Sequence, residues 1–147
     1  MHIELFGVDD EPRMKRALAI RIAVFVDEQH VPLNEEIDGH DRDDTLAVHA
    51  LATFENRDAG TGRFYVRTDA QTVQIGRMAV VREVRGHGIG RALLNALMIA
   101  AKTRGFTQAS LSAQTHARAF YEASGFIASG DIFYDAGIPH QEMTHPL

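Results

Sequence analysis

Apolar residues recur every three or four positions in three segments of this chain, and this spacing is typical of helices. The first predicted helix covers residues 9–29. Asp9 or Asp10 can cap its start, and Pro12 suits its first turn. Its predicted apolar face carries Met14, Leu18, Ile22 and Phe25. The clearest helix covers residues 90–105, with an apolar stripe made of Leu93, Leu94, Leu97, Ala100 and Ala101. A third helix is predicted over residues 116–125, and glycine ends both later helices.

Runs rich in β-branched residues predict strands between and beyond these helices. The predicted strands cover residues 3–8, 45–54, 62–68, 72–81 and 107–114, with one or two more within residues 126–147. Residues 30–44 predict an acidic loop, and residues 55–61 a polar turn. The order of elements predicts an α/β (α+β) fold with a mixed sheet layered with helices. The strand–helix–strand segment over residues 72–114 predicts a right-handed crossover.

Length and composition fit one domain over residues 1–147, since 45% of the residues are apolar and 24% are charged. The net charge of −5 argues against nucleic acid or an anionic membrane as the main partner. There is no cysteine, which excludes a thiolate nucleophile and a cysteine-based zinc site. With no apparent signal peptide or membrane-spanning run, these features predict a cytoplasmic protein.

Glycines stand at alternate positions in "RGHGIG", residues 85–90, where the clearest helix begins. A helix start presents free N–H groups and a partial positive charge. Gly86, Gly88 and Gly90 leave that backbone bare, and Arg85 and Arg91 add positive charge, so the turn can bind an anion. Neither a P-loop nor a dinucleotide fingerprint matches the spacing. The alternative is a turn that only connects a strand to a helix.

The pattern R-x-x-G-x-G in residues 85–90 resembles the pyrophosphate-binding signature of the GNAT superfamily of acetyl-CoA-dependent N-acetyltransferases. The segment "FYEASGF", residues 120–126, resembles the tyrosine-bearing helix and the following strand of that superfamily. Residues 20–38 and 111–143 are similar to the ElaA/YjcF-type branch, so the resemblance covers nearly the whole chain. It implies a GNAT-type fold: a mainly antiparallel sheet with splayed strands and helices on both faces.

The resemblance also implies that acetyl-CoA is the co-substrate. The pantetheine arm would pair with the backbone of Met78, Ala79 and Val80, and the Val80 N–H would meet the thioester carbonyl. Gln114 stands where many members have an asparagine that contacts the arm. The residues expected beneath the pyrophosphate are Arg85, Gly86, His87, Gly88, Ile89, Gly90 and Arg91.

Tyr121 is the expected general acid, because a phenol with a pKa of about 10 keeps the proton that a departing thiolate needs. The alternative is an aromatic packing residue. Related enzymes often carry a glutamate base just before the splayed strand, but Gly76 and Arg77 stand there. Glu28 is the base candidate carried forward. The further candidates are Glu36, Asp38 and His49, and each candidate has a simpler structural explanation.

The acceptor is expected to meet Arg77, Glu36, Asp38 and His140. Arg77 can bind an anionic group or remain a solvated charge, and the acidic loop can attract a cationic amine. That loop lacks the EF-hand spacing, so no metal is predicted. We therefore expect direct transfer of an acetyl group to a primary amine of a small-molecule or peptide acceptor. The alternative is a CoA-binding regulatory or sensor protein, and a homodimer is possible in either case.

Overall fold

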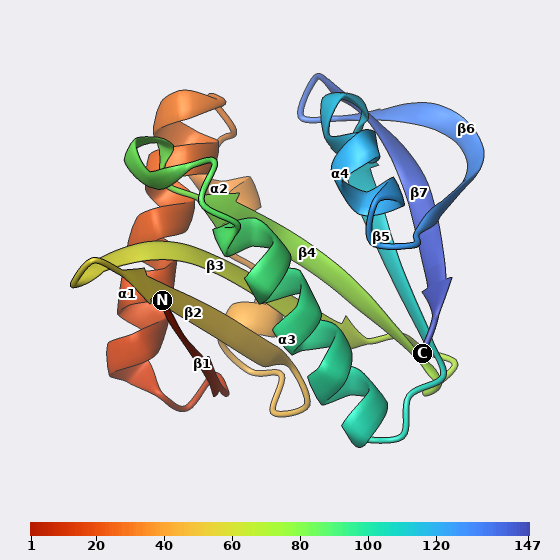
Figure 1. Cartoon of the computed structure of the whole chain (residues 1–147), viewed down its shortest axis with the longest axis horizontal. Coiled ribbons are helices and arrows are strands. Elements are labelled where there is room, and N and C mark those ends of the chain that lie inside the picture. The colour runs from red at the N-terminus through yellow and green to blue at the C-terminus, as the bar shows by residue number, and fades with distance from the viewer.

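Seven strands form one sheet, in the order β1-β2-β3-β4-β5-β7-β6, in the computed structural model, which describes residues 1–147 (Figure 1). The strands are β1 (His2–Phe6), β2 (Val48–Phe54), β3 (Arg57–Val66), β4 (Thr72–Val80), β5 (Gln108–Gln114), β6 (Ile127–Asp135) and β7 (Ile138–Pro146). Only β4 and β5 pair in parallel, and all other neighbours are antiparallel. The mixed, mainly antiparallel sheet is as predicted, and both closing strands are present.

Helices connect and cover these strands. The α-helices are α1 (Glu11–Arg21), α2 (Leu33–Glu36), α3 (Ile89–Thr103) and α4 (Arg118–Glu122). A π-helix, η1 (Ile22–Glu28), continues α1, and 3₁₀ turns form η2 (Gly39–Asp41), η3 (Arg82–Val84) and η4 (Thr115–Ala117). None of the helices is long and apolar enough to cross a membrane.

Helices cover both faces of the sheet. Successive strand residues point to opposite faces, and both faces carry apolar side chains that have to be buried. On β2, Ala50 belongs to the core under α3, whereas Leu51 belongs to the core under α1. Figure 1 shows α3 in front of the sheet and α1 behind it. The apolar stripe predicted for α3 is buried, and Gly105, at φ +91°, follows its end. The predicted pattern of the 90–105 helix is therefore confirmed.

The first helix keeps its predicted start but buries a different face. The Asp10 carboxylate accepts a hydrogen bond from the Arg13 N–H, as a helix cap should. Met14 is buried as predicted, but Leu18 and Phe25 are only half-buried. The residues buried beside Met14 are Ala17, Ile20, Arg21 and Val24. The small Ala17 side chain favours close packing on this face, which continues into the π-helix at Val24.

The turn predicted over residues 55–61 is present but shorter than predicted, because β3 already begins at Arg57. The turn consists of Glu55 and Asn56, at φ +51° and +63°, and such two-residue turns match the twist of a hairpin. Gly60, the glycine assigned to the predicted turn, lies within β3. A Cβ on Gly60 would come within 2.9 Å of the Leu93 side chain, so this glycine permits the close approach of α3.

Candidate functional site

β4 and β5 pair along only part of their lengths. Their ladder joins Thr72–Ile75 to Gln108–Leu111 and then stops, although β4 continues to Val80 and β5 to Gln114. In Figure 1 the two strands start side by side and diverge along their length. The backbone of the second half of β4 therefore has no strand partner on the β5 side, which leaves an open edge inside the sheet.

A β-bulge in β4 lies where the two strands separate. Thr61 pairs with Ala79 and Arg63 pairs with Gly76, so Arg77 and Met78 together stand opposite Gly62. Arg77 takes a φ of +52° at this bulge. A bulge bends its strand and increases the local twist, which turns β4 away from β5. A Cβ on Gly62 would lie 2.4 Å from the Met78 sulfur, so the glycine makes room for the bulge.

The Val80 N–H points into the gap. The next residue, Val81, donates its N–H to the Ala59 carbonyl on the β3 side at 2.9 Å. Because successive N–H groups of a strand point in opposite directions, the N–H of Val80 faces β5. Of the predicted arm-binding residues, Ala79 is buried in the core under α1, while Met78 and Val80 are half-buried at the cleft wall.

The gap widens into a cleft of about 880 Å³ that both sides of the sheet help to form. Val80 and Gln114 line it from the splayed strands, Glu28 from η1, Tyr121 from α4 and His140 from β7. A volume of this size is typical of a small-molecule site. The structure thus brings together residues that lie far apart in the sequence.

The glycine turn at the start of α3 exposes a run of backbone donors. Gly86 and Gly88 take φ values of +85° and +78°, which side chains disfavour, and a Cβ on either would meet open space. The N–H groups of residues 86–91 donate to no protein acceptor, and no side chain caps the helix. These donors and the helix dipole make an anion site.

The other residues of this turn play different parts. Ile89 is buried in the core, so it offers only its N–H, and Arg91 is exposed. The Nδ1 atom of His87 lies 3.0 Å from the Val84 carbonyl oxygen, which ties the turn to η3. A Cβ on Gly90 would lie 3.4 Å from the Phe120 ring, an ordinary van der Waals distance, so Phe120 of α4 packs beside the start of α3.

Arg85 and Glu28 form one ion pair. Two nitrogens of the Arg85 guanidinium donate to the two Glu28 oxygens at 2.8 Å each, and Nε donates to the Val80 carbonyl at 2.9 Å. These hydrogen bonds from Arg85 lower the pKa of Glu28. A carboxylate held in this way is a poor proton acceptor, and the Arg85 side chain is not free to meet a phosphate.

Tyr121 lines the cleft, and its hydroxyl forms no hydrogen bond within the protein. Its ring packs edge-on against Phe120 and Phe126, and no protein group hydrogen-bonds the phenol. Burial raises the pKa of Tyr121 to about 12. The group therefore keeps its proton at every ordinary pH.

Gln114 forms a hydrogen bond with Gln29, a residue for which the sequence predicted no role. Its Nε2 atom donates to Oε1 of Gln29, which follows η1, at 2.9 Å. The contact joins the splayed end of β5 to the region of the π-helix. It occupies the amide that was expected to meet a ligand.

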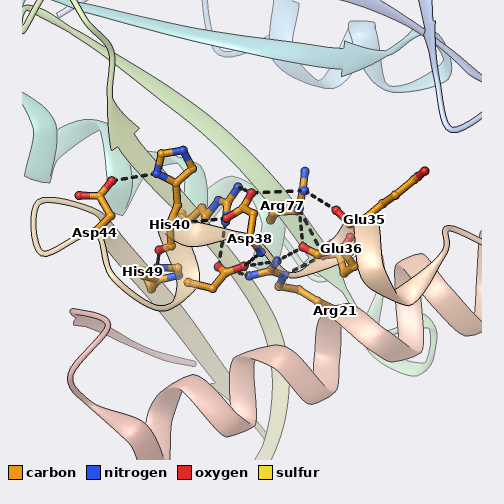
Figure 2. A network of polar contacts seen from close by, with 10 residues as sticks. Arg21, Glu35, Glu36, Asp38, His40, Asp44, His49 and Arg77 are labelled. Carbon is orange, nitrogen blue, oxygen red and sulfur yellow. Dashed lines mark hydrogen bonds and ion pairs between the residues drawn. The ribbon is translucent and has the colours of Figure 1, made fainter.

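Three arginines, Arg21, Arg63 and Arg77, form ion pairs with the acidic loop of residues 30–44. Figure 2 shows this network and labels Arg21 and Arg77. Arg21 donates from Nε to Glu36 at 2.7 Å and from its other nitrogens to Asp41 at 2.6 and 2.9 Å. Arg63 donates to both Asp38 oxygens at 2.7 Å. Burial alone would raise the pKa of Asp41, but the hydrogen bonds and charge of Arg21 and the charge of Arg63 hold it well below its usual range.

The acidic loop predicted over residues 30–44 is therefore not exposed throughout, because Glu36 and Asp41 are only 2% and 5% exposed. Arginine partners neutralise both carboxylates, which is how charged groups enter a protein interior. Asp38 remains half-buried at the cleft. This buried ion pair was not predicted from the sequence, although an arginine within an apolar strand, as Arg63 is in "GRFYV", is a signal that could have revealed it.

Arg77 joins β4 to this network. Its guanidinium donates to the backbone carbonyls of Glu35 and Glu36 at 3.2 and 3.3 Å. It also lies 3.4 Å from the Glu36 carboxylate and 3.7 Å from that of Asp38, as part of Figure 2 shows. Arg77 is thus neither a freely solvated charge nor an unpaired one.

His49 is buried away from the cleft, whereas His140 lines it. His49 is 1% exposed on β2, lies outside the cleft and holds Nε2 3.0 Å from the His40 carbonyl oxygen. Burial lowers the pKa of His49. It therefore cannot serve as a base in this cleft. His140 lines the cleft from β7, where its cross-strand neighbours are Gln114 and Phe133.

Comparisons with known proteins agree with this arrangement. Residues 12–147 match the family model described as an acetyltransferase (GNAT) domain. The chain is 34% identical over 135 residues to YjcF of Bacillus subtilis, described as an uncharacterized N-acetyltransferase, and the match covers 91% of this chain and 93% of YjcF.

Solved structures share the whole fold. Escherichia coli ElaA has a TM-score of 0.86 at 26% identity, with 97% of each chain covered. An aminoglycoside 6'-N-acetyltransferase complexed with coenzyme A has a TM-score of 0.80 at 14% identity, covering 99% of this chain and 97% of the other. The resemblance to GNAT proteins of the ElaA/YjcF type is confirmed.

Proposed function

This chain belongs to the GNAT acetyltransferase family, and we propose that it transfers an acetyl group from acetyl-CoA directly to a primary amine of a small-molecule acceptor. One observation carries the proposal: the gap between β4 and β5 runs beside a glycine turn with free N–H groups and contains an unpartnered tyrosine hydroxyl. A protein of the same fold has been solved with coenzyme A, which supports the assignment of the cofactor.

The N–H groups of residues 86–91 would hold the pyrophosphate, assisted by the exposed charge of Arg91. Because Arg85 pairs with Glu28, its role is to fix the turn to β4 rather than to grip a phosphate. The pantetheine arm would lie along the open edge of β4 and pair with its backbone.

The Val80 N–H would polarise the thioester carbonyl, since it faces the gap and a backbone donor can stabilise the oxyanion of a tetrahedral intermediate. When the C–S bond breaks, Tyr121 would protonate the departing thiolate. A pKa of about 12 keeps its proton in place until then. The transfer is direct and needs no acyl-enzyme.

Calorimetry with acetyl-CoA, followed by a panel of primary amines, tests this function. The panel covers amino acids, polyamines, amino sugars and a lysine peptide, with release of the CoA thiol as the readout. We expect acetyl-CoA to bind and at least one amine to be acetylated. Binding without any product would favour the regulatory or sensor alternative, and no binding at millimolar acetyl-CoA would overturn the proposal.

A further inference from the structure

We propose that His140 is the general base that removes the proton from the acceptor's ammonium group. The inference rests on the proposed transfer function and assigns the one role that the acidic candidates leave open. The amine must be neutral before it can attack a thioester. A proton acceptor therefore has to lie in the cleft within reach of the acceptor's ammonium group.

Hydrogen bonding fixes the form of the His140 ring. Nδ1 lies 2.7 Å from the Ile138 carbonyl oxygen, which can only accept, so Nδ1 carries the proton in the neutral ring. Nε2 then has a free lone pair, and no protein group bonds to it. The ring stacks on Phe133, with centroids 5.8 Å apart and planes 22° apart, which holds its orientation. The result is a positioned proton acceptor at the wall of the cleft.

His140 and Tyr121 reach the cleft from opposite faces of the sheet. Cross-strand neighbours share a face, and Ser112 donates to Glu142 at 2.9 Å across the β5–β7 pair. His140 lies two residues from Glu142 and therefore faces the same side. The alternate β5 residues, such as Leu111, are buried in the core under α3, against which Tyr121 also packs. A base on one face and an acid on the other fit an amine and a leaving thiolate on opposite sides of one thioester.

The three acidic candidates named from the sequence are already engaged. Glu28 is held by Arg85, Glu36 by Arg21, and both Asp38 oxygens by Arg63. Position 77, at the bulge, supplies a guanidinium rather than a carboxylate. Among the groups lining the cleft, His140 combines a fixed tautomer with an uncommitted lone pair.

The proposed step balances as follows. Nε2 of His140 takes a proton from R–NH₃⁺, and the freed lone pair forms a C–N bond to the thioester carbon. The C–S bond then breaks, and its electron pair leaves on sulfur, which takes the Tyr121 proton. The second nitrogen proton and the proton held by His140 are released to solvent, and Tyr121 regains a proton from solvent. The products are the amide, free CoA thiol and one proton.

The test compares the wild-type chain with His140→Gln, using the amine that the panel identifies as the probe. At pH 7 we expect kcat/KM to fall about 10²–10⁴-fold, the range that general base catalysis supplies. The deficit should shrink as the pH rises, because a growing fraction of the amine is already neutral. Acetyl-CoA binding by calorimetry should stay within about twofold, as the substitution touches no proposed cofactor contact. Other titratable groups of the cleft and of the adjoining strands, among them Asp135, Glu142, Tyr121 and His116, remain in both proteins.

His2→Gln is the matched control, because it removes an imidazole whose side chain is 71% exposed, on β1. It should leave turnover unchanged. A ¹⁵N histidine spectrum of the wild-type protein gives an independent readout and should show the neutral Nδ1–H tautomer of His140.

His140→Gln with wild-type kcat/KM, a deficit that does not change with pH, or an Nε2–H tautomer would overturn the assignment while leaving the transferase function intact. Loss of acetyl-CoA binding in the variant would also overturn it. A wild-type chain that acetylates no amine would overturn the function and this role together.

Discussion

Tyr121 is half-buried at the cleft and Asp41 is buried, and their surroundings move their pKa values in opposite directions. Burial without a partner raises the pKa of the Tyr121 phenol, so that it remains protonated in the cleft. Asp41 is also buried, but hydrogen bonds and charge from Arg21 outweigh the cost of removing the carboxylate from water. The environment of Tyr121 therefore suits a proton donor. The environment of Asp41 keeps a permanent negative charge, which holds the acidic loop in place.

Tyr121→Phe should lower kcat by about 10²-fold or more, because the ring stays in place while the proton donor is lost. Affinity for acetyl-CoA should remain near the wild-type value, since the phenol has no binding role in the proposal. Steady-state kinetics and calorimetry measure the two effects. Full kcat in this variant would remove Tyr121 from the mechanism.

Asp41→Asn should reduce the free energy of unfolding at pH 7 by about 3–5 kcal/mol, the usual cost of breaking a buried ion pair. The folded state lowers the pKa of Asp41. Its contribution is therefore complete above the unfolded pKa of about 3.9 and is lost as the pH falls below it. Urea unfolding between pH 7 and pH 3 should show the difference between variant and wild type shrinking only at the acidic end.

Asp43→Asn provides the control for this measurement, since Asp43 is exposed in the same segment. It should change stability by no more than about 0.5 kcal/mol. Equal losses in the two variants would contradict the importance of the buried network.

Among the elements, β4 and the glycine turn after it do most to define the site. The bulge at Arg77 and Met78 separates β4 from β5, and the turn then starts α3 at the end of the resulting gap. Arg85 binds the Val80 carbonyl, which fixes the turn to the strand. The spacing between the anion site and the Val80 N–H is therefore set by one continuous segment.

Gly88→Glu should weaken acetyl-CoA binding at least about tenfold, because a carboxylate would stand at the expected phosphate position and repel it. Gly130→Glu is the matched control. Gly130 has a φ of +74° and open space around it, but it lies on β6, away from the cleft. Both variants strain a left-handed position similarly, so a difference in calorimetric Kd isolates the contact with the ligand. Equal affinities would contradict a phosphate site at this turn.

At the scale of the whole molecule, one sheet joins two hydrophobic cores. Nineteen buried residues pack between the sheet and α3, and seven pack between the sheet and α1. The cleft opens where the sheet itself is interrupted, so a ligand there contacts elements from both halves of the chain.

Acetyl-CoA at a hundred times its Kd should add about 2.7 kcal/mol to stability by binding only the folded chain. For a domain of this size that corresponds to a rise in Tm of roughly 5–10 °C. Thermal unfolding followed by circular dichroism, with and without the ligand, measures the shift. The Gly88→Glu variant should show a smaller shift at the same concentration, and an unchanged Tm in the wild type would contradict binding in the cleft.

Features that depend on neighbouring residues can be read from the amino-acid chain without the fold. The apolar stripe of α3 follows from the helical period, and the left-handed turn at Gly86 and Gly88 follows from the freedom of glycine. Family resemblance located the splayed strand and Tyr121, because both lie in short motifs. These features need few or no distant contacts to be recognised.

The pairing of charged residues, in contrast, depends on how the chain folds. Arg85 pairs with Glu28 across 57 positions, and Arg21 pairs with Asp41 across 20. No local pattern reveals such partners, because the fold of the sheet and of η1 brings them together. The same holds for His140, whose free lone pair follows from a carbonyl contact and a strand register, so the availability of each ionisable group depended on its neighbours in space.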